Sequence, residues 1–260
     1  MKLSENRIIK LKNYILSRKT VTVEEIGNKF GISEVTARRD LARLKKEGFI
    51  IKVHGGAVLR EMGRLETEPV FDDRLSQRKQ EKIRIAREAS KRIKDGSILI
   101  IESGSTCFYL LEFLLERKNL KIATCGIPIA NELIRMARIK KDFEINVSGG
   151  LVRPESQVYT GPSTVEFFNN INAELCFISA LGVSMEKGIS TDNYFDAIVS
   201  REIIEASNRV ILLCDSSKFD KSSYVKIAPL DKIDEVITDN NVGEESIKQL
   251  DNSNTLLTVV

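Results

Sequence analysis

Positions 33–40 read S-E-V-T-A-R-R-D, a stretch that predicts a short helix with two adjacent arginines in its first turns. Ser33 is a good N-cap for that helix, and Gly48 supplies the signal that ends it. At about 100° per residue, one side of the helix is apolar, and we expect that side to be buried. The residues of this face are Ala37, Leu41 and Leu44.

The opposite side of the same helix is basic. It carries Arg39, Arg43 and Lys46, with Arg38 on one flank and Thr36 on the other. Insertion of a helix into the major groove of DNA requires such a cationic outer face. An arginine binds either guanine edges or backbone phosphates, and the sequence leaves open which arginine does which. Asp40 either holds an arginine in position or complements the helix surface.

The flanking segments complete a small domain. Apolar residues at helical spacing predict a first helix over about 5–18, and T-V-E-E at 22–25 fits the capping box of a second helix that runs to Phe30. A β-prone run at 49–53 meets the turn H-G-G at 54–56, which predicts a hairpin and therefore a winged helix over residues 1–58. We expect DNA contacts from Ser33, Thr36, Arg38, Arg39, Arg43, Lys46, Lys52 and His54.

The charge distribution agrees with a nucleic-acid-binding head. Residues 1–60 hold 14 Lys/Arg against 6 Asp/Glu, a net charge of +8, whereas the rest of the chain has a net charge of −5. A basic head on a mildly acidic body indicates that the head alone binds phosphates.

The motifs of this head resemble those of the DeoR family of bacterial transcriptional regulators. The residues that carry the resemblance are V-E-E-I at 23–26, F-G-I-S at 30–33, T-x-R-R-D-L at 36–41 and H-G-G-A at 54–57. The resemblance implies a regulator that binds a double-stranded DNA operator, and repression is the commoner behaviour in the family.

The remainder of the chain has a different pattern. Residues 59–72 are polar and contain Pro69, so we interpret them as a linker. Over 73–260, seven apolar runs alternate with helical segments, which predicts an α/β domain with a mostly parallel sheet. The runs lie at 98–101, 122–125, 145–147, 175–179, 210–214, 236–238 and 256–260.

Three loops that follow these runs predict an anion site, because ligands of such sheets bind at the carboxyl ends of the strands. E-S-G-S-T at 102–106 opens a helix, S-G-G at 148–150 lets the backbone approach a ligand, and D-S-S-K-F at 215–219 supplies Lys218. Small hydroxyl residues beside a glycine at a helix start present donors to an anion. Together the loops favour a phosphate-bearing ligand.

The resemblance to the DeoR family extends over this domain, which in that family is related in fold to ribose-5-phosphate isomerase and coenzyme A transferases and binds phosphorylated sugars. It implies that residues 103–106 cradle the phosphate, with Lys218, Gly149 and Gly150 nearby. Glu102 and Ser179 depart from the family's usual aspartate and glycine. The expected effector-binding residues are Arg74, Lys82, Glu102, Ser103, Gly104, Ser105, Thr106, Thr124, Gly149, Gly150, Asp215 and Lys218.

Two other functions compete with an effector-controlled repressor. Glu102 and Asp215 are carboxylates at strand ends, where the general base of a sugar-phosphate isomerase with a DNA-binding tail would lie. A DNA-binding architectural protein without a ligand is the third alternative. Because one winged helix buries little surface, an operator with two-fold symmetry calls for a homodimer or homotetramer.

The sequence indicates no cofactor, metal or membrane. His54 is the only histidine and is more typical of a turn than of a pH switch, and the four cysteines form no C-x-x-C pair, so we expect buried thiols rather than disulfides or zinc. No apolar run approaches the roughly 20 residues that span a bilayer. With no secretory signal at the start of the chain, we expect a cytoplasmic protein.

Overall fold

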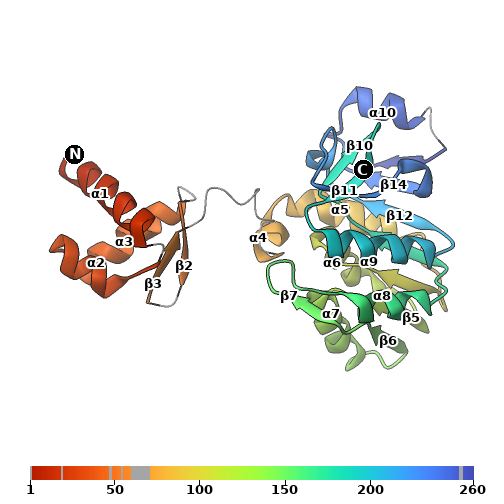
Figure 1. Cartoon of the computed structure of the whole chain (residues 1–260). Coiled ribbons are helices and arrows are strands. Elements are labelled where there is room, and N and C mark those ends of the chain that lie inside the picture. Colours follow the sequence, from red (N-terminus) through yellow and green to blue (C-terminus); the bar gives the residue numbers. More distant parts are fainter. Residues whose placement is uncertain (1, 19, 47–48, 54, 60–70, 252–253) are drawn as a thin grey trace. The chain divides into compact units, whose positions relative to one another are not determined.

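A computed structural model describes residues 2–18, 20–46, 49–53, 55–59, 71–251 and 254–260 (Figure 1). The chain divides into two compact units, Met1–Thr67 and Glu68–Val260. Two ends of the expected linker, 59–72, belong to secondary structure instead: Leu59 ends a strand and Phe71 begins a helix. Phe71 is buried and packs edge-on against Phe108, so the start of α4 is anchored to the second unit.

The first unit is a winged helix, as the sequence predicts. Three helices, α1 (Lys2–Arg18), α2 (Val23–Phe30) and α3 (Glu34–Lys46), accompany a small antiparallel sheet of β1 (Thr20–Thr22), β3 (Gly56–Leu59) and β2 (Ile50–Val53), in that order. The expected buried face of α3 is confirmed, because Ala37, Leu41 and Leu44 are fully buried against α1 and α2 residues such as Leu11 and Ile26.

Local signals position these helices. The capping box of α2 is confirmed: Glu25 N donates to Thr22 Oγ1 over 3.1 Å, and Thr22 N donates to the Glu25 carboxylate over 2.8 Å. Gly31 ends α2 in the left-handed conformation, and Thr36 N donates to Ser33 Oγ at the start of α3. Gly48, the expected end signal of α3, lies outside the described residues.

Strand β1 is an element that the sequence does not predict. It pairs with β3, and a Cβ on Gly56 would lie 2.2 Å from the carbonyl oxygen of Val21. Glycine is therefore required at position 56 for the hairpin to approach β1. The H-G-G turn serves the internal packing of the wing as well as its shape.

The second unit is built on a seven-stranded parallel sheet, and all seven expected runs form its strands. The sheet order is β15 (Leu256–Val259), β14 (Glu235–Thr238), β12 (Val210–Leu213), β9 (Leu175–Ile178), β4 (Ile98–Ile101), β5 (Leu120–Thr124) and β6 (Phe143–Val147). The expected α/β domain with a mostly parallel sheet is confirmed.

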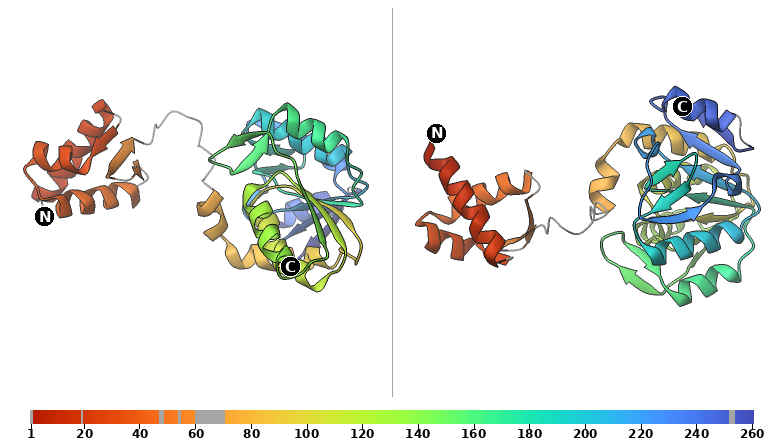
Figure 2. Two further views of the ribbon diagram at one scale, coloured as in Figure 1. Left: turned by 90° about the horizontal axis from the view of Figure 1, so that it is seen from below. Right: turned by 45° about the horizontal axis from the view of Figure 1, so that its top comes forward.

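Helices cover both faces of this sheet (Figure 2). Alternate residues of one strand enter the two cores: Leu99 and Ile101 pack with α5, α6 and α7, whereas Ile100 packs with α8 and α9. The helices are α4 (Phe71–Ser76), α5 (Lys79–Ser90), α6 (Ser105–Leu110), α7 (Ile127–Ala137), α8 (Pro162–Asn169), α9 (Tyr194–Glu205) and α10 (Glu244–Asp251). The helix expected over 108–115 is divided into α6 and a 3-10 helix, η1 (Leu111–Glu116).

Two smaller sheets complete the unit and are not evident in the sequence. One is the antiparallel sheet β10 (Gly182–Ser184), β11 (Gly188–Thr191) and β13 (Val225–Ala228), and the other is the hairpin β7 (Leu151–Arg153) and β8 (Val158–Thr160). Two more 3-10 turns, η2 (Ser216–Lys218) and η3 (Leu230–Lys232), follow strands β12 and β13.

Candidate functional site

The outer face of α3 is basic and open to solvent. Arg38, Arg39, Arg43 and Lys46 are all exposed, and Thr36 is half-buried on the flank. Ser33 is exposed and its hydroxyl hydrogen-bonds to that of Thr36 over 3.0 Å, so its main contact lies within the helix start. The helix therefore presents its guanidinium groups on the side opposite the core, as major-groove binding requires.

The neighbours of the arginines differ. Arg38 donates to Glu34 over 2.9 Å, one turn earlier on α3, whereas Arg39 has neither a hydrogen bond nor an ion pair with any described residue. Asp40 is buried and accepts two hydrogen bonds from Arg7 of α1, at 2.7 and 3.2 Å. Of the two roles open for Asp40, holding an arginine is the one observed, and that arginine belongs to α1.

The wing and the start of α3 add two observations. Lys52 on β2 is exposed, and His54 lies outside the described residues. Val35, which sequence reasoning missed, is 77% exposed on the first turn of α3. An exposed apolar side chain at the start of a recognition helix is the kind of group that contacts thymine methyls.

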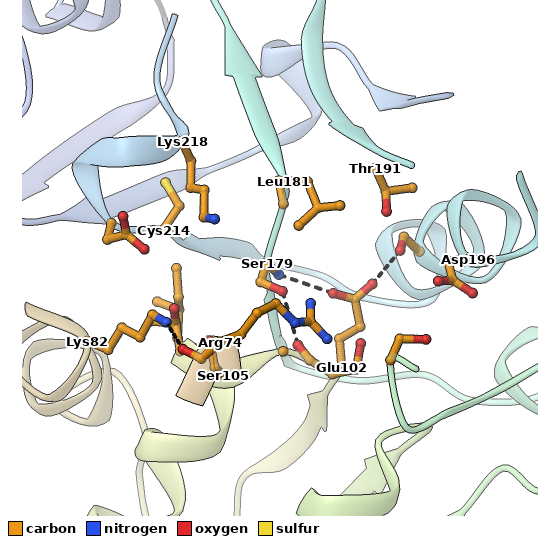
Figure 3. Close-up of a pocket in the computed structure, with 18 of the residues that line it drawn as sticks. Arg74, Lys82, Glu102, Ser105, Ser179, Leu181, Thr191, Asp196, Cys214 and Lys218 are labelled. Carbon is orange, nitrogen blue, oxygen red and sulfur yellow. Dashed lines mark hydrogen bonds between the residues drawn. The ribbon is translucent and has the colours of Figure 1, made fainter. Parts of the chain in front are cut away.

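The second unit contains a cavity of about 330 Å³ at the carboxyl ends of three adjacent strands (Figure 3). The loops after β4, β9 and β12 form its floor, because these strands are neighbours in the sheet. Nine of the expected effector-binding residues line it: Arg74, Lys82, Glu102, Ser103, Gly104, Ser105, Thr106, Asp215 and Lys218.

The hydroxyl loop after β4 is shaped by Gly104. This residue has φ +102°, and a Cβ here would lie 2.2 Å from Ser179 Oγ of the loop after β9. Ser179 in turn donates to the carbonyl of Ser103 over 3.1 Å, so the two loops are fixed against each other. Gly104 gives α6 no side-chain cap. The first N–H groups of this helix therefore receive no acceptor from the N-cap side chain.

Positive charge gathers on one side of the cavity. Lys82 of α5 is buried, and its ammonium donates to the carbonyl of Arg74 over 2.5 Å. Burial lowers the pKa of Lys82 to about 8, the nearby Asp215 partly opposing this effect. Neither Lys82 nor Lys218 forms an ion pair with a described residue, so both have charge available for an anion.

Two of the three described carboxylates that line the cavity, Glu102 and Asp215, accept hydrogen bonds from protein donors. Glu102 is buried and accepts from Ser179 N over 3.1 Å and from the Ser200 hydroxyl. Asp215 accepts from Ser217 N over 3.1 Å, and Arg78 Nε lies 3.7 Å from it. The two carboxylates thus organise the loops and balance part of the positive charge.

Three expected effector residues do not line the cavity. Thr124 is buried at the end of β5 and donates to the carbonyl of Glu102 over 2.9 Å, so it supports the hydroxyl loop from outside. Gly149 accepts from Thr164 Oγ1, and a Cβ on Gly150 would lie 2.3 Å from that same oxygen. The close approach expected at Gly150 is therefore made to α8, because β6 is at the sheet edge, two strands from β4.

Other residues of the cavity were not found from the sequence. They include Arg78, Ser156, Thr191, Asp196 and Ser200. Only Arg78 carries a local signal in the structure: it is a non-glycine residue with φ +49°, a conformation that concentrates at functional sites. The remaining residues come from the β7–β8 turn, β11 and α9, which no strand-end argument singles out.

An arginine-bearing winged helix accompanied by an α/β unit with a cationic cavity defines a DNA-binding regulator with a separate sensor domain. Residues 7–62 match the DeoR-like helix-turn-helix domain, and residues 77–240 match the DeoR C terminal sensor domain. The chain belongs to the DeoR family and is a DNA-binding transcriptional regulator, as its motifs predict.

Relatives match along nearly the whole chain. The glycerol-3-phosphate regulon repressor of Escherichia coli (strain K12) is 32% identical over 219 residues, 84% of each chain. The regulator GolR of Listeria innocua is 31% identical over 245 residues, 94% of this chain and 93% of the relative. The regulator IolR of Bacillus subtilis is 30% identical over 239 residues, 92% of each.

Solved structures match more distantly. Ribose 5-phosphate isomerase from Plasmodium falciparum has a TM-score of 0.38 at 12% identity, over 53% of this chain and 51% of that one. eIF2B beta from Chaetomium thermophilum has a TM-score of 0.40 at 16% identity, over 61% and 50%. Among the described residues, none of the helices has the length and apolar character to cross a membrane.

Proposed function

We propose that this protein is a repressor of sugar-metabolism genes whose affinity for its operator changes when a phosphorylated sugar binds the cavity of the second unit. The observation that carries the proposal is the clustering of Lys82, Lys218 and the 103–106 loop around one cavity of about 330 Å³. One buried and one half-buried lysine beside small hydroxyl groups match the charge and the acceptor oxygens of a phosphate.

The relatives support the same ligand class. The name of the E. coli relative associates it with glycerol 3-phosphate, a phosphorylated polyol. The cavity volume is at the small end of the range of about 300–1,000 Å³ for ligand sites, which suits a triose to hexose phosphate. Control of DNA binding follows by linkage, since a ligand shifts operator affinity only if it binds the DNA-competent and DNA-incompetent states unequally.

In the DNA complex, we place the exposed face of α3 in the major groove, with Arg39 and Arg43 toward the bases or phosphates and Lys52 of the wing on the backbone. Two such heads on one operator imply at least a homodimer. A cytoplasmic location follows from the proposed access to DNA.

The experiment is an operator-binding titration by fluorescence anisotropy, with and without a panel of triose, pentose and hexose phosphates. One member of the panel should change operator affinity by about 5- to 150-fold, the usual range of allosteric coupling. Unchanged operator affinity across the whole panel would refute effector control. Loss of operator binding in Arg39→Ala, with the sensor unit intact, would support the DNA face independently.

The proposal includes the absence of catalysis. An aldose–ketose isomerase needs a carboxylate within reach of a substrate C–H. Glu102 and Asp215, the two candidates, accept hydrogen bonds from Ser179, Ser200 and Ser217, which supports a structural role for both. Turnover of pentose or hexose phosphates by the purified protein would contradict this part.

A further inference from the structure

The cavity has a second end that differs chemically from the cationic one. Figure 3 shows Lys82 and Lys218 on one side of the cavity and Asp196 and Thr191 on the other. Ser156, in the turn of the β7–β8 hairpin, also lines the cavity. Asp196, on the first turn of α9, pairs with Arg153, a cation that is not among the lining residues.

Two buried polar atoms of these lining residues lack a protein partner. Within the described part of the chain, neither Asp196 Oδ1 nor Ser156 Oγ has a hydrogen bond, although both atoms are buried and Ser156 is only 2% exposed. Buried polar atoms are nearly always hydrogen-bonded, because an unmade bond leaves their desolvation uncompensated. Two such atoms among the residues of one cavity point to a ligand that completes them.

The Asp196 carboxylate is held so that one oxygen remains for that ligand. Its Oδ2 accepts from the Arg153 guanidinium, which comes from β7. Burial raises the pKa of Asp196 to about 6, a value at which the carboxylate is still ionised above neutral pH. Ionised, it is an acceptor only, and the natural partner of a buried carboxylate acceptor in a sugar site is a hydroxyl donor.

Building on the proposed function, we propose that Asp196 and Ser156 bind the hydroxyl groups of the effector at the end remote from its phosphate. Asp196 Oδ1 accepts from one hydroxyl, and Ser156 Oγ exchanges a hydrogen bond with another. The cavity then selects a phosphorylated polyhydroxy compound over inorganic phosphate and over a phosphate ester that lacks the distal hydroxyls. Asp196 and Ser156 are specificity-determining residues, and the 103–106 loop and the lysines bind the phosphate common to all these ligands.

The test measures dissociation constants by calorimetry at pH 7.5 with the full chain. The ligands are the panel's best polyol phosphate, its deoxy analogue and inorganic phosphate. Wild-type protein should bind the polyol phosphate about tenfold or more tightly than the deoxy analogue, because a site built to hydrogen-bond a hydroxyl rejects an analogue without it. Asp196→Asn and Ser156→Ala should each raise the dissociation constant of the polyol phosphate by about tenfold or more and leave the affinity for inorganic phosphate unchanged.

Two controls keep the result interpretable. Asp231→Asn makes the same charge change at an exposed position of η3 that does not line the cavity, and it should retain the wild-type preference. Ser156→Ala removes a hydroxyl that has no hydrogen-bond partner among the described residues, so this variant should be at least as stable as wild type. It therefore tests the proposal even if Asp196→Asn, which weakens the pairing with Arg153, destabilises the protein.

The outcomes separate this inference from the proposed function. A wild-type protein that binds polyol phosphate and deoxy analogue equally, or variants that keep the wild-type preference, would overturn the roles of Asp196 and Ser156 while leaving effector control intact. A wild-type protein that binds no phosphorylated sugar would overturn both. The selective loss described above, restricted to hydroxylated ligands, would establish the hydroxyl-binding end.

Discussion

Replacing Lys82 by methionine removes one buried positive charge from the cavity and leaves an apolar side chain of similar length. Lys82 is 4% exposed and lies among the residues that line the cationic end. The substitution should raise the unfolding free energy of the ligand-free protein and should weaken the binding of the effector. A single variant is therefore expected to give two effects of opposite sign.

The stability effect follows from the pKa of the ammonium. Burial lowers the pKa of Lys82 from 10.5 to about 8, so the unfolded chain binds this proton more tightly than the folded one. The resulting loss of unfolding free energy is fully present below about pH 8 and disappears as the pH rises toward 10.5. Discounted for solvent screening, the penalty is roughly 1 to 2 kcal/mol at pH 7, and Lys82→Met should recover it.

The binding effect has the other sign. One charge-assisted hydrogen bond to a phosphate contributes about 1.5 to 3 kcal/mol, so the dissociation constant of the effector should rise by roughly 10- to 100-fold. Urea unfolding of the ligand-free protein measures the first effect, and calorimetry with the best sugar phosphate and with inorganic phosphate measures the second.

Lys79→Met is the matched control. It makes the same substitution on the first turn of α5 at an exposed position that does not line the cavity, and both measurements should stay near wild type. If Lys82→Met binds the phosphate ligands as tightly as wild type, the cationic end has been assigned to the wrong place. Because the substitution also removes the hydrogen bond to the Arg74 carbonyl, the burial argument is tested by the pH dependence: it is wrong if Lys82→Met gains no more unfolding free energy over wild type at pH 7 than at pH 10.

Three further predictions concern other parts of the molecule. Arg39→Ala should weaken operator binding by about tenfold or more without changing the unfolding free energy of the chain, whereas Lys10→Ala on α1 should leave operator binding near wild type. Anisotropy titrations at several salt concentrations should show a smaller salt dependence for Arg39→Ala only. Gly104→Ala should lower the unfolding free energy by about 1 to 3 kcal/mol, because of its φ of +102° and the 2.2 Å approach to Ser179 Oγ; adding Ser179→Gly should restore part of the loss, and an undisturbed Gly104→Ala protein would contradict the geometry. Effector affinity should fall as the pH rises from 7 to 9, because the phosphate stays dianionic while Lys82 loses its proton near pH 8, and the slope should vanish in Lys82→Met.

Periodicity and local motifs were enough to predict the main elements. The buried face of α3, the capping box of α2 and the seven strands of the large sheet each depend on neighbours within a few residues, and all are confirmed. The short strands β1, β7 and β10 were missed because three residues carry too little pattern to separate a strand from a loop.

The sequence by itself determined which residue types meet at strand ends, and hence a DNA-binding head with an anion-binding α/β unit. Only the tertiary structure decided which of those ends share a cavity, because sheet order differs from chain order. Strands β12, β9 and β4 are neighbours, so Lys218 and Ser105 face one cavity, whereas β6 at the edge takes Gly150 away from it. Long-range contacts likewise gave Glu102 a hydrogen bond from Ser200, a residue 98 positions away, and left Asp196 Oδ1 without a donor among the described residues, which no local pattern encodes.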